Sequence, residues 1–587
     1  MFVPIIRRSF PLLFLTAATA TSCSGTEQKA GDDDSNTGTG RGMDASPDTD
    51  TGADSGAGTD TDSAYDTEYV PDPETCEEAA QSHTYVGCDF WPTVLPNTVG
   101  THFDYAVVVS NAGTATATVT IEHEGKVVAS GDVAPSGLKK FFLPWVAALK
   151  NWNVPCGETG FPVLPLSASK RVVDGAYHLT STVPVTVFQF SPLEYGAKGG
   201  PEGKDWSACK KCIGGCYSYT NDASLLLPST ALTGNYRITA PPGQNASVVE
   251  PGYFAVTGIE DGTTVKIKVG PLGEVKAGGG LSAAQAGQIF SFKLAKAEVV
   301  IVTGTPTTDL SGTILNADKP VQAISGAPCH QMPAGVTACD HLEETVVPAE
   351  TLGRRYFVVV PTSARGQPVG HIVRIYGNVD NTKLTYFGVP PAGAPATINA
   401  GEVYDLGQVG TGFEVKGSHE LAVTSFLLGS QISDTQSSHS QGDPAQSNVQ
   451  PVEQYRKKYV FLAPDDYISS YADVVAPTGA AITLDGETVT AAEEKASNGY
   501  AVRRIKLGAG QDGAHVIESD QPFGMQVMGY GSWTSYQYPG GLNLLHLRAA
   551  DRGVEGSPDA RVDFLSTSGR RARSCTRTPR GSGPRGT

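Results

Sequence analysis

The sequence predicts an all-β protein made of about four tandem sandwich-like units. Three observations lead to this fold class. The 587 residues include 68 glycines and 39 prolines, a composition that favours many short strands and turns over long helices. One short pattern recurs along the chain, and each copy follows runs in which apolar and polar residues alternate, as in half-buried strands.

The recurring pattern is a polar pair and a proline between two short apolar runs. Residues 312–327 read GTILNADKPVQAISGA, and residues 175–190 and 514–529 have the same form, while residues 417–430 keep it with Leu421 in the proline's place. Because repeats at fixed spacing identify repeat architectures, we take these stretches as the closing strand of successive units. Proline has no N–H for a sheet ladder, so it is expected at the strand's first residue or on an edge.

The spacing of the copies supports a repeat. Taking Pro184, Pro320, Leu421 and Pro522 as equivalent gives steps of 320−184 = 136, 421−320 = 101 and 522−421 = 101 residues.

Within each unit the sequence predicts a proline-bearing strand start followed by a β-hairpin. Alternating runs on either side of an Asn- or Gly-containing turn are a strong hairpin signal. The strand starts are residues 94–96, 225–228, 346–348 and 449–452. The hairpin strands are residues 105–109 with 118–121, 253–256 with 265–269, 371–376 with 383–387, and 471–476 with 481–484. Helix is expected only as one or two turns at residues 146–151 and 491–497.

The strand density distinguishes two architectures. About six or seven strands per ~100 residues is typical of a sandwich, whereas a propeller blade has about four strands in ~45 residues. We therefore expect tandem sandwiches, with a closed, propeller-like arrangement of the four units as the alternative.

The start of the chain has the layout of an export signal. Arg7 and Arg8 precede an apolar run over residues 10–20, which is too short to span a membrane. Residues 20–23, Ala-Thr-Ser-Cys, resemble a bacterial lipoprotein processing box and predict cleavage after residue 22 with lipid attached to Cys23. The predicted location is the outer membrane, reached through the lipid anchor only, and plain secretion is the alternative.

Charge is concentrated in one segment. The formal net charge is −17, and residues 24–75 hold 14 acidic and 2 basic residues. A polar segment of this kind cannot bury enough apolar surface to order itself, so residues 23–75 are predicted to be a disordered linker. The remaining body is close to neutral, which argues against a nucleic-acid partner.

These patterns divide the chain into a signal peptide (1–22), a linker (23–75), four β units (76–200, 201–343, 344–445 and 446–545) and a tail (546–587). The tail contains nine arginines and no lysine. We interpret it as out-of-frame translation or a truncated gene end, with a basic arm as the alternative.

The cysteine content indicates disulfide bonds in an oxidising compartment. Without Cys23 and Cys575, eight cysteines remain, an even number that fits four bridges. Cys329–Cys339 is the pairing best supported by proximity, and Cys76–Cys88 is the next. Cys156 is then left to pair within the cluster Cys209, Cys212 and Cys216, and its connectivity stays open.

Two groups have metal-like spacing. Cys209, Cys212 and Cys216 could share a zinc ion, but bridges are the favoured interpretation in an oxidising compartment. Cys329, His330, Asp340, His341 and Glu344 form the second group, for which a structural role is favoured. No metal, cofactor or catalytic residue is therefore predicted, since neither a G-x-S-x-G elbow nor an H-E-x-x-H motif occurs. Trp533, Tyr536 and Tyr538 are predicted to be exposed, where they either contact a glycan or protein or only cap the last sandwich.

A resemblance to a known family adds to this reading. It is carried by residues 221–228 (NDASLLLP), 231–236 (ALTGNY), 252–256 (GYFAV) and 329–348 (CHQMPAGVTACDHLEETVVP). These segments resemble the IgG Fc-binding domain family, named for the N-terminal region of the Fc-binding protein of animal mucus and found in many predicted bacterial surface proteins. The resemblance covers residues 91–544. The acidic spacer behind a lipoprotein signal resembles exported proteins of myxobacteria.

Three functions follow as hypotheses. The first is a non-enzymatic cell-surface lipoprotein that binds an extracellular protein or glycan in adhesion or matrix organisation, and this is the one we favour. The second is a secreted hydrolase with an unrecognised site on the β scaffold. The third is a structural component of the envelope.

Overall fold

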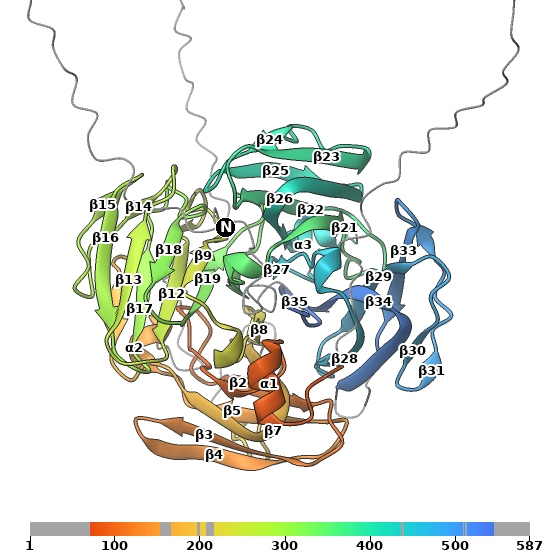
Figure 1. Cartoon of the computed structure of the whole chain (residues 1–587), viewed down its shortest axis with the longest axis horizontal. Coiled ribbons are helices and arrows are strands. Elements are labelled where there is room, and N and C mark those ends of the chain that lie inside the picture. Colours follow the sequence, from red (N-terminus) through yellow and green to blue (C-terminus); the bar gives the residue numbers. More distant parts are fainter. Residues whose placement is uncertain are drawn as a thin grey trace, which may run out of the picture. The chain divides into compact units, whose positions relative to one another are not determined.

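A computed structural model describes residues 71–152, 166–196, 200–206, 217–434, 436, 440–508, 510 and 513–544. These residues belong to one compact unit, residues 65–587. Strands make up most of the regular secondary structure of the described chain, as predicted (Figure 1). The predictions for residues 1–70 and for the tail from residue 546 concern residues outside the described part.

Four sets of strands repeat one topology. The first set is β1 (Gly87–Phe90), β2 (Tyr105–Asn111), β3 (Ala117–His123), β4 (Lys126–Val133), β5 (Gly137–Leu143), β7 (His178–Phe190) and β8 (Ala223–Leu226). The second is β9 (Asn235–Arg237), β12 (Tyr253–Gly258), β13 (Thr263–Lys268), β16 (Ile289–Leu294), β17 (Val299–Thr303), β18 (Ile314–Ala317), β19 (Val321–His330) and β20 (Asp340–Thr345).

The third and fourth sets follow the same plan. The third is β21 (Gly353–Val358), β22 (His371–Gly377), β23 (Thr382–Gly388), β24 (Thr397–Ile398), β25 (Val403–Val409), β26 (Phe413–Phe426) and β27 (Gln446–Asn448). The fourth is β28 (Arg456–Leu462), β29 (Ser469–Pro477), β30 (Ile482–Leu484), β31 (Glu487–Thr488), β32 (Glu494–Lys495), β33 (Tyr500–Lys506), β34 (Ala514–Gly531) and β35 (Thr534–Pro539).

Small elements complete the described chain. The strand β6 (Lys170–Val172) adds to β17, and two short pairs are β10 (Gln244–Asn245) with β11 (Val249–Glu250) and β14 (Glu274–Val275) with β15 (Ala284–Gln285). The helical elements are α1 (Cys76–Ser82), α2 (Ala147–Lys150), α3 (Ser430–Ser433), η3 (Ser229–Ala231), η4 (Ala349–Thr351) and η5 (Val452–Gln454). The expected helix at residues 146–151 exists as α2, whereas residues 491–497 hold the strand β32 instead of a helix.

The closing strand takes part in both sheets of each unit. The first half of β7 pairs with β1 and β3, and its second half pairs with β2 and β8. β26 and β34 repeat this arrangement, and in the second set the strand is broken into β18 and β19. Two sheets that share one bent strand enclose a core, which confirms the sandwich-like units. β8 lies beyond residue 200 but pairs with β7, and the unit boundaries proposed from the sequence stay predictions.

The predicted hairpins are wrong in all four units. β2 pairs with β5 and β7, whereas β3 pairs with β4 and β7. The corresponding strands of the other units also lie in opposite sheets, both paired with the closing strand. The turn between them therefore reverses the chain from one sheet to the other. Turn residues specify a reversal of direction, but burial of the apolar face on each strand decides the pairing partner.

The prolines lie where the closing strand changes sheet. Pro184 and Pro522 are inside β7 and β34, and Pro320 directly precedes β19. In β7 the register shifts between the Asp89↔Thr180 and Gly87↔Val185 pairs, so the proline lies in an irregular stretch that needs no N–H donor.

The same register corrects the repeat spacing by one residue. Gly87 pairs with Val185, Gly353 with Leu421 and Arg456 with Phe523. Leu421 thus corresponds to the residue after the proline, and Glu420 takes the proline's place. With Val321 as the second copy, the steps become 321−185 = 136, 421−321 = 100 and 523−421 = 102.

A tyrosine joins the first strand to the closing strand in three units. The hydroxyl of Tyr356 accepts the Gly353 N–H at 3.1 Å and donates to the Leu421 carbonyl. Tyr236 bridges Thr233 and Val321, and Tyr459 bridges Arg456 and Phe523, in the same way. Phe90 occupies this position in the first unit, three residues after Gly87. A tyrosine three residues after the residue whose N–H it accepts is therefore a structural marker of three of the four units.

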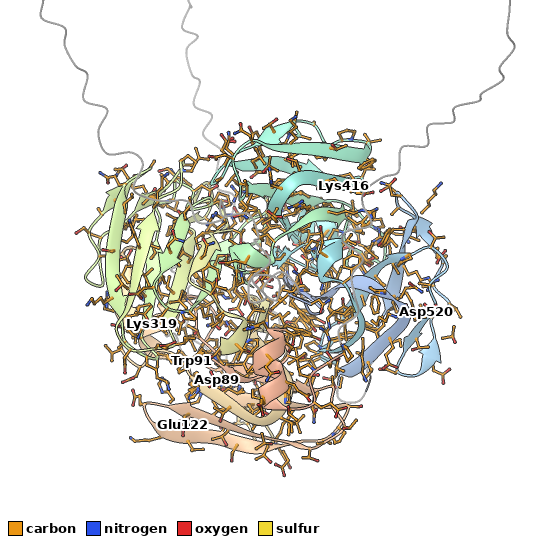
Figure 2. All side chains as sticks on the ribbon, viewed as in Figure 1. Asp89, Trp91, Glu122, Lys319, Lys416 and Asp520 are labelled. Carbon is orange, nitrogen blue, oxygen red and sulfur yellow. A yellow bond between two sulfur atoms is a disulfide. The ribbon has the colours of Figure 1, made fainter. Side chains whose placement is uncertain are left out.

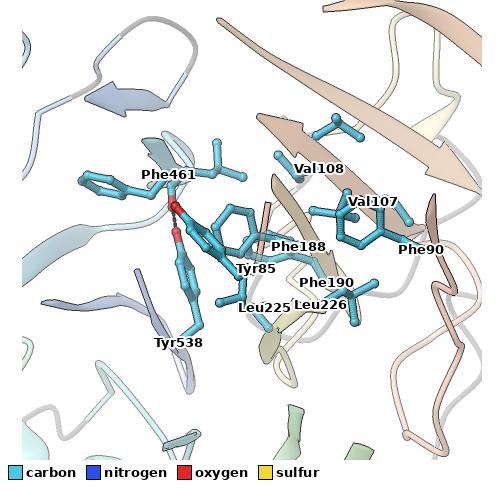
Figure 3. Packing of buried hydrophobic residues seen from close by; sticks show 14 of the residues in the cluster. Tyr85, Phe90, Val107, Val108, Phe188, Phe190, Leu225, Leu226, Phe461 and Tyr538 are labelled. Atoms are coloured by element: carbon cyan, nitrogen blue, oxygen red, sulfur yellow. Dashed lines mark hydrogen bonds between the residues drawn. The ribbon is translucent and has the colours of Figure 1, made fainter. Parts of the chain in front are cut away.

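Side chains from different units pack together. Phe188 and Phe190 of β7 lie against Tyr538 of β35, with ring centroids 4.9 and 6.2 Å apart (Figure 3). The first and second units meet where Trp91 donates its indole N–H to Ser229 at 2.9 Å and Asp89 accepts from the same hydroxyl (Figure 2).

The inner strands β8, β20, β27 and β35 lie next to one another. β8 contacts β20, β20 contacts β27, β27 contacts β35, and β35 contacts β8. Three of them are labelled near the middle of the view in Figure 1. The contacts correspond to the closed arrangement of units that the sequence left as an alternative, with each unit a two-sheet sandwich instead of a single-sheet blade.

Candidate functional site

The inner strands place one equivalent residue from each unit around Asp222. In each unit, the closing-strand residue three positions after Val185, Val321, Leu421 or Phe523 pairs with a residue of the inner strand. These partners are, in unit order, Leu225, Thr345, Asn448 and Pro539. Two positions before these partners are Ala223, Glu343, Gln446 and Gln537. The Asp222 carboxylate accepts the backbone N–H of all four, at 2.9, 3.1, 3.0 and 3.3 Å respectively.

This arrangement fixes the four units relative to one another. Asp222 is completely buried, and a buried charged group is stable only when its hydrogen-bonding capacity is satisfied. Burial raises the pKa of the Asp222 carboxyl, the N–H donors of Gln446 and Glu343 lower it, and the neighbouring Glu343 charge raises it further. We call Asp222 and the four N–H groups the axial hub.

More acidic side chains lie around the axial hub. Asp340, Glu343, Glu344 and Asp443 are all at most 1 % exposed. Burial raises the pKa of Glu343 to about 8 and that of Asp443 to about 7. Asp340 accepts from the Thr534 hydroxyl at 2.8 Å and from the Ser535 N–H at 3.1 Å, which links the second unit to the fourth. These carboxyls therefore hold strands together and have no access to a substrate.

The second group with metal-like spacing is divided by the fold. Cys329 is bonded to Cys339, which confirms that predicted disulfide. His341 Nε2 lies 3.2 Å from Glu343 Oε2, within hydrogen-bond distance. The Glu344 carboxyl accepts the side-chain amide N–H of Asn448 at 3.0 Å. His330 is buried, which lowers its pKa to about 4. Within the described ranges, no group of three or more His, Cys, Asp or Glu side chains is arranged to hold a metal ion.

The second predicted disulfide is also confirmed. Cys76 in α1 is bonded to Cys88 in β1, so the N-terminal helix is tied to the first sheet. Cys23, Cys156, Cys209, Cys212 and Cys216 lie outside the described residues, and their lipid attachment and pairing stay predictions.

With the axial hub buried, the loops at one end of the inner strands become the candidate site. In each unit one segment connects the closing strand to the inner strand: residues 191–222, 331–339, 427–445 and 532–533. We call these segments, in their described parts, the closing loops. They differ in length far more than the strands do, as is common for segments that carry binding residues on a rigid scaffold.

The closing loops of all four units meet. The Ser532 N–H of the fourth unit donates to the Tyr195 hydroxyl of the first at 2.6 Å. The Trp533 N–H donates to the Ser440 carbonyl of the third unit, also at 2.6 Å. The third unit reaches the second, because the Gly429 N–H donates to the Met332 carbonyl at 2.7 Å. The loops therefore form one continuous surface.

Aromatic side chains line part of this surface. Tyr195 stacks on Tyr217 with centroids 4.8 Å apart, and Tyr217 meets Tyr219 at 5.7 Å. Trp533, Tyr217 and Tyr219 are partly exposed. The prediction that Tyr536 and Tyr538 are exposed is wrong, because both are fully buried in the core of the fourth unit. They point to the core side of β35, so of the three predicted aromatics Trp533 alone is partly exposed.

Small cavities lie between the third and fourth units. Two hollows between the third and fourth units have about 20 Å³ each, room for about one water molecule. Tyr356 and Leu352 line one, and Phe357 and Tyr455 line the other. Neither accommodates an organic ligand.

More than half of the chain matches a known protein family. The family model described as "IgGFc binding protein" matches residues 222–529, from the axial hub to the last closing strand. The chain belongs to the IgGFc-binding protein family. The human IgGFc-binding protein is 25% identical over 342 residues, which are 57% of this chain and 6% of the human protein. The chain thus spans a small fraction of that relative's length.

A solved structure, the native alfa-L-rhamnosidase from Aspergillus terreus, covers 64% of this chain and 50% of its own at 10% identity with a TM-score of 0.10. That score is too low to indicate a shared fold. In the part of the chain that the structure describes, no helix has the length and apolarity of a membrane span.

Proposed function

We propose that this IgGFc-binding family member is a non-enzymatic binding protein that is exported, anchored through lipid on Cys23, and presents its closing loops to an extracellular protein or glycan. The observation that carries the proposal is the meeting of closing loops from all four units at one surface, on a scaffold whose family is defined by a binding protein. Adhesion or matrix organisation is the role that such a display fits.

The buried carboxyls support binding over hydrolysis. Asp222, Asp340 and Glu343 are wholly inaccessible, and each holds backbone or side-chain donors from another unit. A general acid or base must reach the substrate proton within hydrogen-bond distance. These carboxyls cannot do so without opening the fold.

The ligand is tested with the full secreted chain. The protein is immobilised and exposed to extracellular proteins and to arrayed glycans, with a heat-denatured sample as the control. We expect saturable binding that is weakened when an exposed closing-loop residue such as Gln431 is replaced by Arg, and that is unaffected by replacement of exposed Glu487 in β31 by Arg. Binding that is altered equally by both changes would contradict the use of the loop surface.

The anchor is tested separately in a bacterial host. Globomycin, which blocks lipoprotein signal processing, is expected to cause the unprocessed precursor to accumulate, and Cys23→Ser is expected to abolish palmitate labelling. Normal processing in the presence of globomycin would show that the chain is secreted without lipid.

A further inference from the structure

Two aromatic residues adopt a backbone conformation that favours glycine. The inner-strand register makes Tyr219, Cys339, Gly442 and Trp533 equivalent, each four residues before Ala223, Glu343, Gln446 and Gln537. Gly442 has φ of 85°, Tyr219 has 54° and Trp533 has 58°. The left-handed region is disfavoured for residues with a Cβ and is unusual for bulky ones.

Cys339 of the second unit lies outside the positive-φ region, whereas the third unit has the positive-φ turn. There the chain uses glycine, which adopts positive φ without steric cost. The first and fourth units keep the same backbone turn but carry Tyr and Trp. Strained backbone that is retained at a surface indicates a functional constraint, so these two rings serve a purpose other than the turn itself.

The residues around the two rings form a continuous uncharged patch. The backbone N–H of Trp533 donates to the Ser440 carbonyl at 2.6 Å, and Gln441 forms an isolated antiparallel β-bridge with Ser532. The Ser532 N–H donates to the Tyr195 hydroxyl at 2.6 Å. Tyr195 stacks on Tyr217, which contacts Tyr219. We call the six partly exposed residues the aromatic patch: Tyr217, Tyr219, Ser440, Gln441, Ser532 and Trp533.

The backbone beneath the aromatic patch is rigid. The Asn221 N–H donates to the Thr534 hydroxyl at 3.0 Å, and the Thr534 hydroxyl donates to Asp340 at 2.8 Å. Asn221 and Thr534 directly follow the Tyr219 turn and Trp533. The two rings are therefore held on adjoining units that cannot move apart without breaking buried hydrogen bonds, which is the pre-organisation that lowers the entropy cost of binding.

We propose that the aromatic patch binds a neutral saccharide. Aromatic rings cover the apolar C–H face of a sugar ring, while the serine hydroxyls and the glutamine amide can exchange hydrogen bonds with sugar hydroxyls. None of the six residues carries a charge. The charged groups that adjoin Ser440 and Gln441 in the described part, Arg365 and Asp434, are paired with each other at 2.9 Å, and Asp434 also accepts the N–H groups of Ser440 and Gln441. A stable protein interface needs about 20–30 residues on each side, several times the size of this patch. The inference rests on the proposed binding function and names its ligand class and site.

The test uses the full secreted chain on an array of neutral and sialylated oligosaccharides, with the strongest neutral binder then titrated by calorimetry. We expect neutral oligosaccharides to bind and sialylated ones to bind no better. Trp533→Gly is expected to weaken binding at least 10-fold while the melting temperature stays equal or rises, because glycine relieves the backbone strain. Trp533→Phe is expected to retain most binding. Phe387→Ala, an aromatic change at a partly exposed position of β23 outside the closing loops, is expected to leave it unchanged.

Three outcomes would overturn the inference. One is a Trp533→Gly variant that binds the oligosaccharide normally. A second is a Trp533→Gly variant whose melting temperature falls by several degrees, since the indole would then be needed for the fold. The third is a wild-type chain that captures a protein ligand but no saccharide, which would leave the proposed binding function standing and remove only the saccharide site.

Discussion

The Asp222 carboxylate accepts the backbone N–H of Gln446 at 3.0 Å, although the two residues are 224 positions apart and belong to the first and third units. The same carboxylate accepts from Glu343 and Gln537 of the second and fourth units. One side chain thus satisfies equivalent donors from every unit. This makes Asp222 the residue on which closure of the four units depends.

Replacing Asp222 by Asn should strongly destabilise the protein. The amide nitrogen cannot accept a hydrogen bond and would face two of the four N–H groups, and each buried donor left unsatisfied costs about 1–3 kcal/mol. We expect Asp222→Asn to lower the free energy of unfolding by about 2–6 kcal/mol in a denaturant titration followed by tyrosine and tryptophan fluorescence.

The matched control for this substitution is Asp520→Asn. Asp520 also accepts a backbone N–H, that of Ala481 at 2.9 Å, but it is exposed on β34 (Figure 2). Its loss is expected to change stability by under about 0.5 kcal/mol. Equal effects of the two substitutions would refute the role given to the axial hub.

The repeated tyrosine is expected to contribute through its hydroxyl. Tyr356→Phe removes the acceptor of the Gly353 N–H and the donor to the Leu421 carbonyl, both buried, while keeping the ring. We predict a loss of about 1–3 kcal/mol in the free energy of unfolding. Tyr386→Phe, which removes one bond at a partly exposed site, should cost less; a larger cost there would argue against the motif as a marker of the repeat.

The Cys329–Cys339 bond should stabilise the second closing loop. It closes a loop with a sequence separation of 10 residues, for which the chain-entropy model gives about 3 kcal/mol. The Cys329→Ser, Cys339→Ser double variant is expected to unfold at a lower temperature by a few degrees. Mass spectrometry of a non-reduced digest should show the linked peptides in the wild type, and their absence would contradict the assigned pairing.

Stability should fall as pH rises above about 6.5. Burial raises the pKa of Glu343 to about 8 and that of Asp443 to about 7, so the folded state retains protons that the unfolded state has lost above its carboxyl pKa of about 4. The stabilisation that these two carboxyls give is fully present below the unfolded carboxyl pKa and is lost as pH rises through their pKa values in the folded state. Burial lowers the pKa of His341 to about 3. This histidine opposes the fall of stability with rising pH only below about pH 6.5, where it binds a proton in the unfolded state.

Melting temperatures measured from pH 6.5 to 9 test this dependence. The wild type should lose stability over that range, and Glu343→Gln, which cannot ionise, should lose less. A Glu343→Gln profile that runs parallel to the wild type would show that Glu343 is not one of the groups responsible.

Local patterns in the sequence predicted the strands well and their partners poorly. The alternating runs around residues 105–109 and 118–121 are strands, but the turn between them crosses from sheet to sheet. Sequence periodicity reports which face of a strand is buried, not which strand lies beside it. The repeat was visible because its proline tolerates only positions that need no ladder N–H, and its phase was wrong by one residue at Leu421, where no proline fixes the alignment.

Other features had signals that could have been used. Thr75 and Glu78 form a capping box at the start of α1, and the spacing T-x-x-E is legible in the sequence. Asp222 lies in the segment that carries the family resemblance, yet nothing local distinguishes it from a turn aspartate. Its role depends on three N–H groups supplied from distant residues, and such a convergence appears only once the units are assembled.

Hydrogen exchange at the amides of Glu343, Gln446 and Gln537 tests the central claim, closure of four units on one carboxylate, most directly. In the wild type these three amides should be among the slowest to exchange, and in Asp222→Asn all three should exchange faster together, although they lie in three different units. Faster exchange confined to the β7–β8 region, with the other three inner strands unchanged, would contradict the account.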